Sequence, residues 1–143
     1  MFRQWRPLGE ELGTFPGLDV EVRGREVTVV WDEWVNGVCV FRMRAAFGPS
    51  LASLRIWDES SVGFDPQPPV ADSEFDPNEP GHYNAHVEHA SAVLESYNEY
   101  ARMMYKRIDR YFLWGQEIVV MLDIADCDPV VTIEVPRAAG HGA

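Results

Sequence analysis

The alternation of apolar and polar residues predicts half-buried strands in the first part of the chain. Phe41 and Met43 alternate with Arg42 and Arg44, so one face of this stretch is apolar and the other carries cations. β-Branched and aromatic residues are frequent in three further stretches, as is typical of strands. The chain is therefore expected to begin with four strands, at residues 20–23, 26–31, 39–44 and 53–57.

Two turn signals lie between these expected strands. Gly24 separates the first two, and a glycine tolerates the positive φ that a tight turn can require. The pair Asn36-Gly37 precedes the third strand and is the pair best suited to a type I′ turn. The sequence therefore predicts two successive hairpins.

A stripe of apolar residues at alternating spacings of four and three predicts one long helix between His82 and Gly115. Gly115 can supply the left-handed cap at which a helix ends. We expect the helix to lie across a sheet rather than to form a coiled coil, because its stripe contains alanines and tyrosines and lies between strands. The stripe consists of Tyr83, Val87, Ala90, Leu94, Tyr97, Ala101, Met104, Ile108 and Tyr111.

Two β-rich stretches follow, at residues 118–124 and 130–135, and are expected to form a third hairpin. The order ββββαββ indicates a single α+β domain over residues 1–143, an antiparallel sheet of about five to six strands with the long helix packed on one face. Residues 136–143 are expected to fray. The expected core contains Val27, Val29, Cys39, Phe41, Leu94, Tyr97, Met104, Ile108, Val120, Leu122, Val131 and Ile133.

The formal net charge of −11 comes from the middle of the chain. No Lys or Arg occurs from Ile56 through Ala101, whereas this stretch contains ten acidic residues. A field of one sign argues against binding of nucleic acids or anionic membranes and favours a basic protein partner or a cation. The alternative is a solvated surface that keeps the protein soluble. The ten acids are Asp58, Glu59, Asp65, Asp72, Glu74, Asp76, Glu79, Glu88, Glu95 and Glu99.

Most of these acids belong to residues 58–81, which we call the acidic segment. It contains five prolines, and its composition opposes regular structure. Connections in compact domains usually span only about 4 to 6 residues. The acidic segment is therefore expected to be either a functional surface or a disordered segment.

Three histidines are the first candidates for chemistry, because His82, His86 and His89 would share one strip of the expected helix. Two histidines one turn apart are a recurrent zinc pair, and a catalytic site would add a carboxylate and leave one position open to water. Histidines also occur at the edge of an apolar stripe without binding any ligand, and no HExxH motif is present. Both interpretations stay open.

The remaining candidates favour a role without catalysis or a cofactor. Asp123, Asp126 and Asp128 could surround a hard cation, but a hairpin turn with local amide hydrogen bonds is favoured. Cys39 and Cys127 fit neither a disulfide framework nor a closely spaced zinc site, so we expect free thiols. No nucleophile elbow and no glycine-rich phosphate loop occurs in the sequence.

The sequence thus favours an acidic interaction domain that inhibits, neutralises or escorts a basic protein partner, as immunity proteins, antitoxins, phage inhibitors and secretion chaperones do. A small metal-dependent enzyme or metal-binding domain built on the three histidines is the alternative. The chain has no apolar run long enough for a membrane helix or a signal peptide, so it is expected in the cytoplasm. The expected partner-binding residues are Trp57, Asp58, Glu59, Phe64, Asp65, Asp72, Glu74, Phe75, Asp76, Glu79 and Tyr83.

Overall fold

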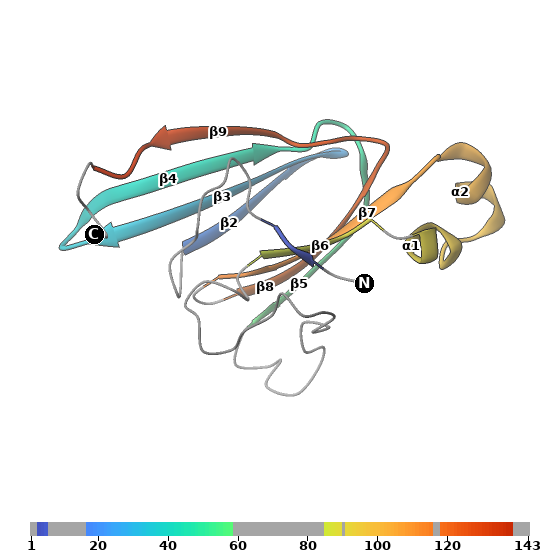
Figure 1. Ribbon diagram of the computed structural model, residues 1–143, viewed down its shortest axis with the longest axis horizontal. Coiled ribbons are helices and arrows are strands. Elements are labelled where there is room, and N and C mark those ends of the chain that lie inside the picture. The colour runs from blue at the N-terminus through green and yellow to red at the C-terminus, as the bar shows by residue number, and fades with distance from the viewer. Residues whose placement is uncertain (1–2, 6–16, 59–84, 90, 116–117, 139–143) are drawn as a thin grey trace.

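The chain forms two antiparallel sheets (Figure 1). The computed structural model describes residues 3–5, 17–58, 85–89, 91–115 and 118–138. Among these residues, sheet I has the strand order β1 (Arg3–Gln4), β6 (Ala85–Glu88), β7 (Ile108–Trp114), β8 (Ile118–Ala125) and β5 (Leu51–Asp58). Sheet II has the order β2 (Gly17–Arg23), β3 (Glu26–Val35), β4 (Val38–Ala46) and β9 (Val130–Val135). Helices α1 (Ser91–Glu95) and α2 (Glu99–Met104) connect β6 to β7.

The two sheets pack face to face around one core, because alternate residues of each strand point inward. Phe47 follows β4 of sheet II and contacts Tyr111 of β7 in sheet I, with ring centroids 5.0 Å apart. Trp5 and Trp31 extend this aromatic group, and their centroids lie 5.4 Å apart. The core also contains Val27, Val29, Phe41 and Met43 from sheet II and Leu113, Val120, Leu122 and Ile124 from sheet I.

The two predicted hairpin turns are confirmed. The turn between β2 and β3 begins with Gly24, whose φ is 63°. The turn between β3 and β4 consists of Asn36 and Gly37, with φ of 50° and 77°. Positive φ at both central residues is what a type I′ turn requires, and Asn-Gly adopts it at low cost.

The predicted long helix is wrong, and with it the α+β class and the helix packed on a single sheet. The last part of the expected helix is strand β7, which is buried on both faces: Tyr111 and Leu113 enter the core, and Phe112 is buried on the outer face of sheet I. A continuous apolar run of this kind is typical of a central strand. Burial on two faces therefore outweighed the helical periodicity of a single stripe.

Only the middle of the expected helix is helical. Asn98 separates α1 from α2, and its side chain accepts a hydrogen bond from the Ala101 amide at 2.9 Å, which caps α2. The helices pack on one end of the outer face of sheet I, where Val93 is buried with Ile108 and Ala125. No helix in the described ranges is long and apolar enough to cross a membrane.

The predicted third hairpin is also wrong. β9 pairs with β4 in sheet II, whereas β8 lies between β7 and β5 in sheet I. Strands β7 and β5 occupy both edges of β8, so β9 pairs instead with the edge of β4 in sheet II, where Val131 and Ile133 pack against the shared core. Strand β8 is nevertheless central in its sheet, as its apolar run predicts.

The predicted core is confirmed in part. Met104 was expected to be buried but is 57% exposed on α2, which overturns that assignment. The predicted stripe placed Met104 on the helix face that was expected to pack on a sheet. In the structure, the buried residue of α2 is Ala101. Buried as predicted are Val27, Val29, Phe41, Ile108, Val120 and Leu122, while Cys39, Leu94, Tyr97, Val131 and Ile133 are half-buried.

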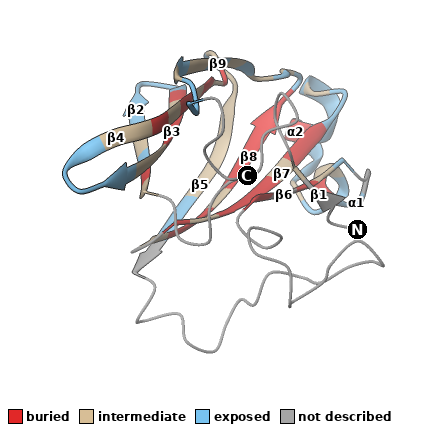
Figure 2. Cartoon of the chain, turned by 60° about the vertical axis from the view of Figure 1, so that its left-hand side comes forward, coloured by how far each residue is buried: buried red, intermediate tan, exposed pale blue. Residues whose placement is uncertain are grey.

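The two ends of the sandwich differ (Figures 1 and 2). We call the end with α1 and α2 the helical end; there Arg25 donates a hydrogen bond to the Tyr105 hydroxyl at 3.1 Å and joins the helices to sheet II. The opposite end, which we call the hairpin end, carries the Asn36-Gly37 turn. Figure 2 shows that turn as an exposed tip and β7 and β8 as buried strands.

Alanine substitutions at Leu122 and at Met104 should distinguish the sandwich from the predicted helix packed on one sheet. Leu122→Ala should lower the free energy of unfolding by about 2–5 kcal/mol, because Leu122 is fully buried between the sheets. Met104→Ala should change it by less than about 0.5 kcal/mol, because Met104 is exposed. Urea unfolding of both variants measures this, and equal losses would contradict the sandwich.

Candidate functional site

The residues expected to bind a partner begin at the hairpin end. Trp57 and Asp58 are the last residues of β5, and Asp58 pairs with Ile118 at the start of β8. Ala85 starts β6 opposite Leu113, near the end of β7. Because the strands are antiparallel, Asp58 and Ala85 lie at the same end of sheet I. The others expected lie outside the described residues: Glu59, Phe64, Asp65, Asp72, Glu74, Phe75, Asp76, Glu79 and Tyr83.

The helical strip of histidines does not form. His86 belongs to strand β6 and His89 follows that strand, so the two residues do not share a helix. His82 lies outside the described residues. No group of three His, Cys, Asp or Glu side chains among the described residues could hold a metal ion. The hypothesis of a metal site on a helix therefore loses its geometric basis.

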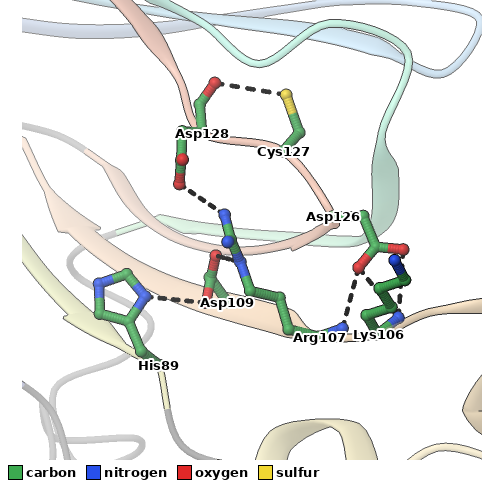
Figure 3. Close-up of polar contacts among 7 residues, drawn as sticks. All are labelled: His89, Lys106, Arg107, Asp109, Asp126, Cys127 and Asp128. Atoms are coloured by element: carbon green, nitrogen blue, oxygen red, sulfur yellow. Dashed lines mark hydrogen bonds and ion pairs between the residues drawn. The ribbon is translucent and has the colours of Figure 1, made fainter.

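A cluster that the sequence did not predict surrounds Asp109 at the helical end (Figure 3). Asp109 of β7 is fully buried, and its two carboxylate oxygens contact His89 Nδ1 at 2.8 Å and Arg107 Nε at 2.9 Å. Arg107 Nη2 also donates to Asp128 Oδ1 at 2.5 Å. These bonds hold together the segments that follow β6, precede β7 and follow β8, so the cluster fixes three connections at once.

The electrostatics of the cluster follow from these contacts. The hydrogen bond to Asp109 raises the pKa of the Arg107 guanidinium further above its ordinary value. Burial, and after it the negative charges of Asp109 and Asp128, raises the pKa of the nearby Tyr111 phenol. Arg107 thus stays a cation and Tyr111 a neutral phenol at neutral pH.

Asp126 and its neighbours close the same end of the sandwich. The Asp126 carboxylate accepts hydrogen bonds from the Lys106 and Arg107 amides at 3.0 and 2.9 Å, and its own φ is 51°. The expectation of local amide bonds at this turn is therefore wrong for Asp126, because its acceptors serve a segment about twenty residues away in sequence. Figure 3 also shows Cys127 bonded to the Asp128 carbonyl, at 3.3 Å.

A second buried carboxylate lies on the outer face of sheet I. Asp123 of β8 receives two bonds from its cross-strand neighbour Arg110, at 2.8 and 2.9 Å, and a third from the Tyr97 hydroxyl at 2.5 Å. Burial and the hydrogen bond to Asp123 raise the pKa of Tyr97 above its ordinary value. Because Tyr97 lies between α1 and α2, this bond attaches the helices to the sheet.

These clusters use their polar atoms for structure. A buried aspartate on histidine Nδ1 is the arrangement that orients a catalytic base, but the second oxygen of Asp109 serves Arg107. The thiol of Cys127, which Figure 3 also shows, donates to the Asp128 carbonyl rather than to His89. The arrangement therefore resembles an ion-pair network that fixes loops more closely than an active site.

The outer face of sheet II carries a shallow groove of about 310 Å³. Arg44, which lines the groove, pairs with Glu134 of β9 and lies 3.8 Å from Glu21 of β2. The groove is lined by Asp19, Val20, Glu21, Val30, Asp32, Arg42 and Arg44. Its acids and arginines alternate across strands, so the charges largely compensate each other and select neither a cation nor an anion.

Comparisons with family models, curated proteins and solved structures find no match to this chain. The charge distribution and the geometry of the described residues are therefore what the functional proposal rests on. Of the residues above, Asp109 is one that the sequence could have indicated, because a strand reading of Ile108 to Leu113 places an acid on the inward face. Nothing in the sequence indicated that Asp109 would pair with His89, or that Arg107 would join it to Asp128, because these residues come from separate connections.

Removal of the buried Asp109 carboxylate should destabilise the fold more than removal of the exposed Asp128 carboxylate. Asp109→Ala should destabilise the fold by about 1–3 kcal/mol, because it removes the acceptor of two hydrogen bonds in a buried site. Asp128→Ala should cost less than about 1 kcal/mol, because its side chain is 80% exposed. Thermal unfolding of both variants compares them, and a larger loss for Asp128→Ala would refute the assigned roles.

The bond between Tyr97 and Asp123 should give stability that is lost in alkali. The raised pKa of Tyr97 means that the fold favours the neutral phenol. Its contribution is complete below the unfolded pKa of about 10 and declines as the pH rises through the higher folded pKa. The difference in unfolding free energy between wild type and Tyr97→Phe should therefore be constant from neutral pH to about 9 and shrink above about 10. A difference that grows in alkali would contradict the preference of the fold for the neutral Tyr97 phenol.

Proposed function

We propose that this protein binds a basic protein partner through the acidic segment and thereby neutralises or escorts that partner. The observation that carries the proposal is the absence of Lys and Arg from Ile56 through Ala101 against ten acids. The described arginines Arg44, Arg107 and Arg110 form ion pairs with acids outside that stretch. Uncompensated acids repel one another, and a cationic partner would relieve that repulsion.

The attachment of the segment supports the same proposal. Asp58 and Ala85 lie at one end of sheet I, so the chain leaves and re-enters the sandwich at the hairpin end. The buried ion pairs of Asp109 are at the other end. A partner attracted to the acidic segment would approach without disturbing the ion pairs that stabilise the fold.

Binding of this kind has a defined physical signature. Charges of one sign accelerate association with an oppositely charged protein and lose this effect as salt screens them. The proposal covers inhibitors, immunity proteins, antitoxins and secretion chaperones without choosing among them. Aromatic residues within the segment, such as Phe64 and Phe75, remain predicted anchors.

Charge reversal inside and outside the segment tests the proposal. Asp72→Lys/Glu74→Lys should slow association with a basic partner, isolated on the immobilised protein at low salt, by roughly tenfold, and dissociation should change less. Asp19→Lys/Glu26→Lys changes the net charge equally at exposed positions of sheet II and is the matched control. Association rates across a salt series measure the effect.

Two results would count against the proposal. Equal slowing by both variants would mean that only net charge matters and that the acidic segment is not the binding surface. Unaltered rates for the first variant at every salt concentration would reduce the segment to a device for solubility.

A further inference from the structure

Strand β9 forms one edge of sheet II. One side of β9 pairs with β4, and no strand in the described part of the chain pairs with its other side. Figure 1 shows β9 at the upper margin of the sheet. Backbone amides and carbonyls along such an edge form a template for one more strand. The chemistry of this edge therefore selects an extended strand as its occupant.

The sequence of β9 lacks most of the features that protect edge strands from pairing. The strand reads Val-Val-Thr-Ile-Glu-Val, so it contains no Lys and no Pro, and five of its six residues are β-branched. Its one charged residue, Glu134, forms an ion pair with Arg44 of the same chain. A β-bulge lies at Glu134, and regular pairing with β4 extends from Val130 to Ile133. These four residues offer a regular, uncharged edge.

Side chains on the core face of β9 remain partly exposed at this edge. Val131 and Ile133 are half-buried, whereas their partners on β4, Ala45 and Met43, are fully buried. On the outer face, Val130 is 70% exposed. The accessible surface of Val131 and Ile133 therefore lies on the side away from β4, where one more strand would cover it.

The sequence of β9 is complementary to itself in an antiparallel pair. With a two-fold axis through Thr132, this residue lies opposite Thr132 of a second copy, and Val131 lies opposite Ile133 on the core face. Val130 then lies opposite Glu134, so no charge faces a like charge. Opposed threonines and opposed β-branched apolar residues are favourable cross-strand pairs.

The other edge of sheet II, strand β2, lacks this self-complementarity. A two-fold axis through Val20 would place Asp19 opposite Glu21 of the second copy. An axis through Asp19 or Glu21 would place that acid opposite itself. Like charges directly opposite each other destabilise a strand pair. Pairing between copies of sheet II is therefore directed to β9.

We infer that two copies of this protein pair through their β9 strands, which joins their sheets II into one continuous sheet of eight strands, four from each copy. Charge complementarity within β9 selects the second copy as the occupant of the edge. A contact between two short strands is at the low end of stable interfaces, so monomer and dimer should exchange as the concentration changes. The inference is independent of the proposed function, because it uses no residue of the acidic segment.

Charges placed on the two-fold axis test this pairing, because residue 132 would face its own copy there. Thr132→Lys and Thr132→Glu should each weaken dimerisation about fivefold or more, since like charges then face each other. An equimolar mixture of the two variants should associate more tightly than either variant alone, since opposite charges then meet on the axis. Sedimentation velocity over a concentration series measures this association.

A control variant and salt complete the experiment. Asp19→Asn changes the net charge as much as Thr132→Lys does, at an exposed position of β2, and should leave dimerisation unchanged. Added salt should strengthen the dimer, because it screens the repulsion between two chains of net charge −11. Binding of a basic partner to the acidic segment should instead weaken in salt.

Three results would overturn the inference. The first is a wild-type protein that stays monomeric at every concentration. The second is a mixture of the two Thr132 variants that associates no better than each variant alone, with melting temperatures that show both to be folded. The third is a set of amide signals of Val130 to Glu134 that shift on addition of a basic partner but not with protein concentration, which would assign the edge to a strand of that partner.

Discussion

Burial of two apolar sheet faces against each other is the constraint on which the rest of this structure depends. Neither sheet can hide its inner face alone, and the contact between Phe47 and Tyr111 joins them at the centre of the core. Among the residues that the structure describes, the buried indole nitrogen of Trp31 has no hydrogen-bond partner. Such a donor costs about 1–3 kcal/mol, and the packing of the Trp31 ring against Trp5 and its neighbours offsets that cost.

The same constraint explains which features were predictable. Turns such as Asn36-Gly37 and the alternating strands around them follow from local conformational preferences, and they formed as predicted. The expected helix failed because the stripe through Ile108 and Tyr111 ignored Phe112 and Leu113, whose burial on opposite faces requires a strand. The pairing of β9 with β4, instead of β8, depends on distant residues and leaves no local signature. The hydrogen bond between His89 and Asp109 was unpredictable for the same reason.

The two ends of the sandwich use charge differently. At the helical end, Asp109 and Asp123 are buried and each meets a guanidinium, so their charges stabilise the arrangement of loops and helices. At the hairpin end, the chain is attached to a long run of acids without cations, and an apolar tip projects from sheet II. Charges that are already paired contribute to the fold, whereas a run of acids without cations and exposed tryptophan and valine side chains are each suited to recognition. This division between the ends underlies the proposed binding of a cationic partner.

The division depends on the two sheets facing each other, and a nuclear Overhauser experiment on the aromatic protons tests that arrangement directly. The sandwich predicts strong cross-peaks between the rings of Phe47 and Tyr111, whose centroids are 5.0 Å apart, and between Trp5 and Tyr111 at the same centroid distance. It predicts no cross-peak from the exposed methyl group of Met104 to the core residues Val120 and Leu122. Cross-peaks from Met104 to Val120, without those between Phe47 and Tyr111, would mean that a helix covers a single sheet and would contradict the account.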